Sequence, residues 1–115
     1  MKSGDVVLAR IWQADDGMKL RPTVLLVRLP PFGDWLTCGM STQLRHYVAE
    51  FDELIMPDSA DFAGSGLRHP SLARLGFLGV VAHAEIGGIL GRLAPERAQR
   101  LRNNLARLLQ AEAPA

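Results

Sequence analysis

The chain has 115 residues, of which 48% are hydrophobic and 22% are charged, and its formal net charge is +1. This length predicts one domain over residues 1–115 and excludes a two-domain enzyme with a separate nucleotide-binding half. The composition is that of a folded protein, and no apolar run approaches the roughly 20 residues of a membrane-spanning helix. A single cysteine, Cys38, excludes an internal disulfide. We therefore expect a cytoplasmic protein with no membrane association.

The charges are unevenly distributed along the chain. Residues 50–63 hold five acidic side chains and no basic one, whereas residues 64–111 hold seven arginines and two glutamates. Arginine's planar fork suits bidentate contacts to phosphate or carboxylate, although a GC-rich genome that favours arginine codons explains the same bias. The nearly neutral total argues against nonspecific coating of a nucleic-acid duplex.

The first third of the chain predicts two strands. Residues 5–12 are rich in β-branched and aromatic side chains, and the Asp-Asp-Gly sequence at residues 15–17 predicts a chain reversal after them. The nearly continuous apolar run at residues 23–29 predicts a strand that is buried on both faces. Because proline is tolerated at the first residue of a strand, Pro22 is expected to start this one and Arg21 to lie at its mouth.

The middle of the chain is less regular. Residues 35–40 predict a third strand, in which Gly39 indicates a bulge or the close approach of another part of the chain. A polar loop is expected at residues 41–46. Residues 47–56 alternate as a strand would, although a helical turn fits them too, and residues 57–69 predict a long loop with one helical turn.

The second half predicts more strands and one helix. Residues 71–77 and 88–93 are expected to be strands, and residues 80–86 fit either a strand or a short helix. A helix is predicted from Pro95 to about Gln110, since proline is tolerated at a first helical position and apolar residues then recur at spacings of three and four. This stripe is expected to pack on the core, with the helix arginines on the solvated face. Its members are Ala98, Leu101, Leu105, Leu108 and Leu109.

Together these elements predict a mainly β fold, a small barrel over residues 4–93 with a C-terminal α-helix over residues 95–110. The usual catalytic motifs are missing from the sequence. No Gly-x-Ser-x-Gly elbow surrounds Ser41, which argues against a triad with His46. His46, His69, His83 and Cys38 lack the spacing of zinc ligands, and the glycines form no phosphate-binding loop. No metal site is therefore expected.

Two polar positions remain at strand ends. Arg21 precedes the second predicted strand, and Ser41 follows the third. If these strands are antiparallel neighbours, both positions lie at the same end of the sheet. An arginine beside a hydroxyl there can anchor a phosphate group, although surface residues that form turn hydrogen bonds give the same pattern.

The order of several short motifs resembles the MazF/PemK family of toxin–antitoxin endoribonucleases. The resemblance spans residues 4 to about 110 and rests on Gly4-Asp5-Val6-Val7, Arg21-Pro22, Ser41-Thr42-Gln43, Ser65-Gly66-Leu67 with Pro70-Ser71, residues 89–93 and the leucine-rich helix. It implies an SH3-like barrel of the MazF/PemK/CcdB type that forms a homodimer. It also implies sequence-specific cleavage of single-stranded RNA without a metal ion or cofactor, and inhibition by a cognate antitoxin protein.

The same resemblance assigns roles to individual residues. Arg21 and Ser41 match the catalytic arginine and hydroxyl, while Thr42, Gln43 and Lys19 are expected to contact or shape the substrate site. In such a reaction the RNA 2′-hydroxyl attacks the adjacent phosphorus and yields a 2′,3′-cyclic phosphate and a 5′-hydroxyl. A guanidinium stabilises the charge of the transition state, and a hydroxyl adds one hydrogen bond.

The sequence leaves several residue roles and one alternative function open. The general base is unassigned: His46 has the right chemistry, but no family motif supports it. Asp15 and Asp16, in a loop expected to touch RNA, would oppose a phosphate. Trp12 is expected to pack in the core, while Trp35 could pack there or stack on a base. The alternative function is a noncatalytic binding module on the same barrel, either a degenerate family member or a toxin that acts by protein contact, as gyrase poisons do.

Overall fold

The computed structural model describes residues 1–13 and 17–111. They form six strands, two α-helices and two short 3-10 helices, η1 and η2. In chain order these elements are β1 Asp5–Gln13, β2 Gly17–Arg28, β3 Trp35–Ser41, η1 Leu44–His46, β4 Glu53–Ile55, α1 Phe62–Ser65, β5 Ser71–Val81, η2 His83–Glu85, β6 Ile86–Arg92 and α2 Pro95–Gln110.

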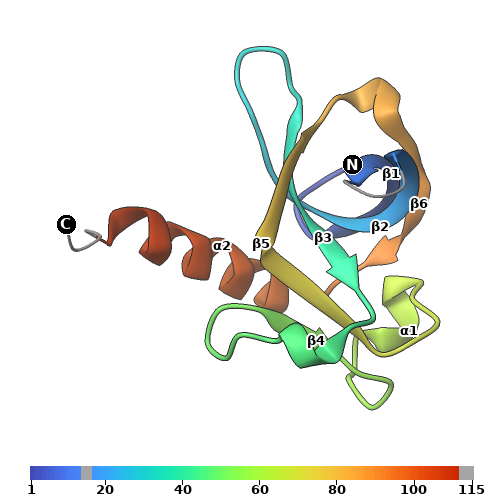
Figure 1. The fold of residues 1–115 in the computed structure, drawn as a ribbon, viewed down its shortest axis with the longest axis vertical. Coiled ribbons are helices and arrows are strands. Elements are labelled where there is room, and N and C mark those ends of the chain that lie inside the picture. Colours follow the sequence, from blue (N-terminus) through green and yellow to red (C-terminus); the bar gives the residue numbers. More distant parts are fainter. Residues whose placement is uncertain (14–16, 112–115) are drawn as a thin grey trace.

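The six strands form one antiparallel sheet in the order β4-β5-β3-β2-β1-β6. The sheet curls strongly on itself into a half-barrel, and α2 extends from it toward the C-terminus (Figure 1). This arrangement confirms the expected mainly β fold with a C-terminal helix. Because the sheet is curled, its two faces bury separate sets of side chains.

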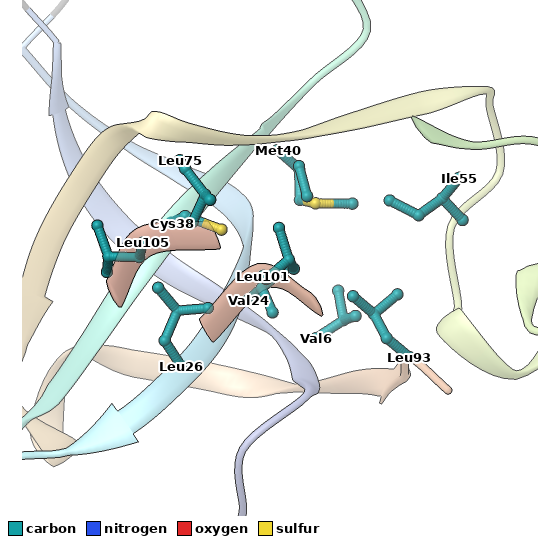
Figure 2. Packing of buried hydrophobic residues seen from close by; sticks show 11 residues of the cluster. Val6, Val24, Leu26, Cys38, Met40, Ile55, Leu75, Leu93, Leu101 and Leu105 are labelled. Atoms are coloured by element: carbon teal, nitrogen blue, oxygen red, sulfur yellow. The ribbon is translucent and has the colours of Figure 1, made fainter. Parts of the chain in front are cut away.

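Alternate residues of the central strands pack into two hydrophobic cores, one on each face of the sheet. Val24 and Leu26 of β2 face a first core that also receives Leu101 and Leu105 of α2 (Figure 2). Leu25, which lies between them in the sequence, joins the second core. The continuous apolar run in β2 therefore arises because this strand is buried on both faces, as predicted. The second core contains Val7, Ala9, Leu25, Trp35 and Val81.

The predicted start of β2 is wrong. The strand begins at Gly17, so Pro22 lies in its middle, opposite Leu8 of β1, and Arg21 is a strand residue. Pairing with β3 begins only at Thr23. The first half of β2 is thus bonded along one side, and proline is tolerated on such an edge because no second neighbour needs its missing N–H.

Most of the strand predicted over residues 47–56 is also absent, since β4 covers only Glu53–Ile55. The buried carboxylate of Asp52 accepts hydrogen bonds from the backbone N–H of Val48 and from that of Leu75, both at 3.0 Å. These bonds close a turn over residues 48–52 and fasten it to β5. An alternating sequence pattern does not reveal this tertiary anchor.

The remaining elements follow the predictions with shifted bounds. The single helical turn expected within residues 57–69 is α1, and residues 80–86 contain the end of β5 followed by η2. The helix α2 has the predicted bounds. Its stripe is buried at Ala98, Leu101 and Leu105, but Leu108 and Leu109 are exposed because the last turns of α2 extend beyond the sheet (Figure 1).

Candidate active site

The register of β2 against β3 places Arg21 and Ser41 on the same face of the sheet. Thr23 pairs with Gly39, and Arg21 and Ser41 each lie two residues beyond this last pair, on the side of the sheet to which Thr23 and Gly39 point. Residues two apart along a strand point to the same face of a sheet. Arg21 and Ser41 are both half-buried. Two polar residues far apart in the sequence therefore share one face of the sheet, at the end of the β2–β3 ladder.

The hydroxyl of Ser41 is held by the turn that follows β3. Its Oγ accepts a hydrogen bond from the backbone N–H of Gln43 at 3.0 Å. A hydroxyl that accepts in this way keeps its own proton to donate to another group. The main chain of Gln43 thus holds the Ser41 hydroxyl, and a contact between Gln43 and substrate stays a prediction.

A second arginine lies on the same face of the sheet. Arg74 of β5 pairs with Gly39 of β3, which alternates with Ser41 on one face. Arg74 is half-buried, as Arg21 is. Sequence reasoning missed it because a strand residue on its own carries no sign of its cross-strand neighbour. The alternation within the predicted strand was the available signal, since it sets Arg74 apart from the apolar residues on either side of it.

Gly39 shows why this part of β3 needs a residue without a side chain. A Cβ built on Gly39 would lie 2.4 Å from the ring of Phe77. The close approach that the sequence predicted at Gly39 is therefore made by an aromatic side chain. We call the half-buried side chains of this region, Arg21, Ser41, Arg74 and Phe77, the arginine face.

The neighbouring residues of the same strands line a pocket at the end of the sheet. Thr42 and Pro22 border this pocket of about 320 Å³, together with Arg68, His69 and Leu90. Thr42 follows Ser41 and Pro22 follows Arg21, but consecutive strand residues point to opposite faces, so Pro22 lies on the other side of the sheet from the arginine face. Lys19, also expected to contact substrate, is exposed on β2 two residues before Arg21 and therefore on the same side of the strand.

Other candidates lie elsewhere or change role. His46 is exposed in η1, and Trp35 is buried in the second core, so Trp35 is not a stacking surface. The guanidinium carbon of Arg28 lies over the Trp35 ring, 5.1 Å from the ring centroid. The side chain of Trp12, and Asp15 and Asp16, lie outside the described residues.

Two features bear on ligands and membranes. No three His, Cys, Asp or Glu side chains are grouped to hold a metal ion in the part of the chain that the structure describes. Among its described helices, none has the length and apolar character needed to cross a membrane.

The arrangement provides cationic and hydroxyl donors beside a partly buried aromatic ring. A guanidinium and a hydroxyl on adjacent strands can both donate to the nonbridging oxygens of one phosphate. Because the strands hold these donors in place before a ligand arrives, little reorganisation is needed to stabilise an anion there. The arrangement can therefore bind an anion such as a phosphate group.

Half-barrel sheets with a C-terminal helix of this kind define the fold of the MazF toxins. The structure of Mycobacterium tuberculosis toxin MazF-mt6 superposes with a TM-score of 0.68 over 95% of this chain and 99% of that one, at 16% identity. An endoribonuclease in complex with its cognate antitoxin, from a mycobacterial species, gives a TM-score of 0.67 over 99% of both chains, at 15% identity. No protein-family model and no curated protein sequence matches the chain. The expected MazF-type fold is thus confirmed.

Proposed function

We propose that the protein is the toxin of a type II toxin–antitoxin system, and that it cleaves single-stranded RNA at short sequences without a metal ion. The observation that supports this proposal is that Arg21 and Ser41 share one face of neighbouring strands, two residues beyond the paired Thr23 and Gly39, in a sheet with the MazF fold. The fold alone is compatible with other activities. Two donors suited to a phosphate on one face favour the ribonuclease over a noncatalytic barrel.

In the proposed reaction the RNA 2′-oxygen forms a bond to the adjacent phosphorus while the bond from phosphorus to the 5′-oxygen breaks. Arg21 donates to the nonbridging oxygens, whose negative charge grows in the transition state, and Ser41 adds one hydrogen bond. Each preorganised donor of this kind contributes about 2.7–4 kcal/mol. A guanidinium is a poor base, so Arg21 does not take the 2′-hydroxyl proton, which passes to water. Donation of a proton to the leaving 5′-oxygen is a secondary role of Arg21, which regains a proton from water afterwards.

The substrate contacts and partners complete the proposal. Lys19, Thr42 and Gln43 flank Arg21 and Ser41 along the chain and guide the RNA backbone past them. The protein acts in the cytoplasm as a homodimer. A cognate antitoxin inhibits it by laying a flexible acidic segment over the arginine face, a partnership supported by the antitoxin complex of one structural neighbour.

Incubation of the purified protein with a long single-stranded RNA in EDTA tests the activity. We expect discrete fragments that carry 5′-hydroxyl and 2′,3′-cyclic phosphate ends. A substrate with one 2′-deoxynucleotide at a mapped cut should resist cleavage there, because the attacking oxygen is missing. Intact RNA at micromolar protein would contradict the proposal and favour the noncatalytic binding module.

A further inference from the structure

The aromatic ring of Phe77 belongs to neither hydrophobic core. The first core gathers around α2 and the second around Trp35, and Phe77 is part of neither cluster. The side chain is nevertheless half-buried rather than fully exposed. The ring of Phe77 packs over β3 at Gly39, which has no side chain. Packing in a hydrophobic core therefore does not explain why this large ring occupies a defined position.

An irregularity in β5 sets this ring in place. Arg74 pairs with Gly39, but the next residue pair joins Leu78 to Cys38, so the three residues from Leu75 to Phe77 have no partner on β3. The bulge is fastened by the buried Asp52, which accepts the backbone N–H of Leu75 at 3.0 Å. Bulges next to active sites commonly re-aim a side chain. Here the bulge turns Phe77 back over Gly39.

The ring also has a defined place relative to the proposed phosphate site. Gly39 lies two residues before Ser41, a rise of about 7 Å along the strand. Thr23, opposite Gly39, lies two residues after Arg21 on the neighbouring strand. The ring is therefore one step along the sheet from Arg21 and Ser41 and on the same face. One nucleotide spans such a step from its phosphate to its base.

From this geometry we infer that Phe77 is the platform on which a base of single-stranded RNA stacks while the adjacent phosphate lies at Arg21 and Ser41. The inference rests on the proposed function and names a further residue of that site. Every base has a flat π-face, so stacking supplies affinity for a single strand and excludes a duplex, whose bases stack on one another. Gly39 is required because any side chain there would displace the ring.

Binding of a fluorescein-labelled, mixed-sequence 2′-O-methyl RNA tests the inference, because this probe has no free 2′-hydroxyl and cannot be cleaved. Fluorescence anisotropy should show that Phe77→Leu weakens binding about tenfold or more, whereas Phe77→Tyr stays within about threefold of the wild type. Phe32→Leu is the matched control, because Phe32 is 88% exposed in the turn between β2 and β3. It should leave binding unchanged.

A second pair of variants keeps Phe77 and adds a Cβ at one of two nearby glycines. Gly39→Ala should weaken binding as Phe77→Leu does, whereas Gly76→Ala should not, because a Cβ at Gly76 meets nothing within 4 Å. Photocrosslinking with an RNA that contains 4-thiouridine should label Phe77. Equal affinity of Phe77→Leu and the wild type, with both proteins folded by circular dichroism, would overturn the stacking platform.

The cleavage assay separates this failure from failure of the proposed function. If the wild type and Phe77→Leu cut RNA with the same kcat/KM, the inference is wrong and the ribonuclease stands. If the wild type binds the 2′-O-methyl RNA through Phe77 but cuts no RNA, the platform stands and the ribonuclease is wrong.

Discussion

Arg21 and Ser41 are the residues on which the account depends, and their placement on one face is a property of the sheet. Each one alone resembles an ordinary polar residue at the surface of a turn. Their common face follows from a single register, Thr23 opposite Gly39. A shift of that register by one residue would send one of the two side chains to the other face, because side chains alternate along a strand.

At the same scale, Cys38 shows what burial does to a potentially reactive group. The thiol is buried in the first core, and desolvation, together with the nearby charge of Asp52, raises its pKa to about 12. A thiol in this state is protonated at pH 8, and the protonated form is not the nucleophile.

We therefore predict that native protein at pH 8 does not react with Ellman's reagent over the time in which protein in guanidinium chloride releases one equivalent of thionitrobenzoate. Absorbance at 412 nm measures the release. Rapid labelling of the native protein would show that Cys38 is accessible and would contradict this packing of β3.

At the scale of elements, α2 is tied to the sheet by an ion-pair network that the sequence did not predict. The Arg97 side chain, expected on the solvated face, is 12% exposed and donates to both carboxylate oxygens of Asp61, at 2.8 and 3.0 Å. It also donates to the Leu54 carbonyl and to Glu53, which accepts from Arg100 as well. Asp61 further accepts the Ala94 N–H at the start of α2. One arginine thus joins β4, the α1 turn and α2.

This network predicts a pH-dependent stability. The hydrogen bonds from Arg97 hold the pKa of Asp61 below its ordinary value despite partial burial. The resulting stabilisation is complete above the ordinary aspartate pKa of about 3.9 and is lost as the pH falls through the lower folded-state pKa. Asp61→Asn should therefore lower the free energy of unfolding by about 1.5–3 kcal/mol at pH 7.

Urea unfolding at pH 7 and near pH 2 measures the effect. The difference in unfolding free energy between wild type and Asp61→Asn should shrink at the lower pH, because acid favours the protonated carboxyl and so weakens its ion pair with Arg97. Asp58→Asn, an exposed change in the same loop, should have little effect at either pH. If the difference in unfolding free energy between wild type and Asp61→Asn is the same at both pH values, the proposed role of the ion pair is wrong.

The same elements show what local sequence can and cannot predict. The bounds of α2 were predictable because its apolar period and Pro95 are local signals. The position of Pro22 within β2 was not, because it depends on which side of the strand has a neighbour. Arg74 and Phe77 were missed for a related reason. Their places are set by pairing with β3 across a three-residue bulge, and the carboxylate that fastens it, Asp52, lies more than twenty residues away in the sequence.

For the whole molecule, a net charge of +1 means that RNA affinity has to come from a local cluster of cations. Lys19, Arg21 and Arg74 lie on one side of the sheet, and each neutralised phosphate of a single strand contributes about −0.7 to the slope of log K against log salt. Three such contacts predict a slope of about −2 for binding of the 2′-O-methyl RNA.

Arg74→Gln should reduce the magnitude of this slope by about 0.7, and anisotropy titrations between 50 and 200 mM salt measure it. Arg10→Gln is the control, because Arg10 pairs with Leu20 and alternates with Ala9, which faces the second core. It therefore lies on the opposite face from Arg21. Equal slopes for the wild type and Arg74→Gln would show that RNA does not contact Arg74.

The central claim is that Arg21 stabilises the transition state of RNA cleavage, and the rate at one mapped cut in EDTA tests it most directly. Arg21→Ala should lower kcat/KM about 10²- to 10³-fold, the cost of removing one preorganised donor. Arg10→Ala, which removes the same charge from the opposite face of the sheet, should stay within about threefold of the wild type. Cleavage by Arg21→Ala at the wild-type rate, or an equal loss in both variants, would contradict the account.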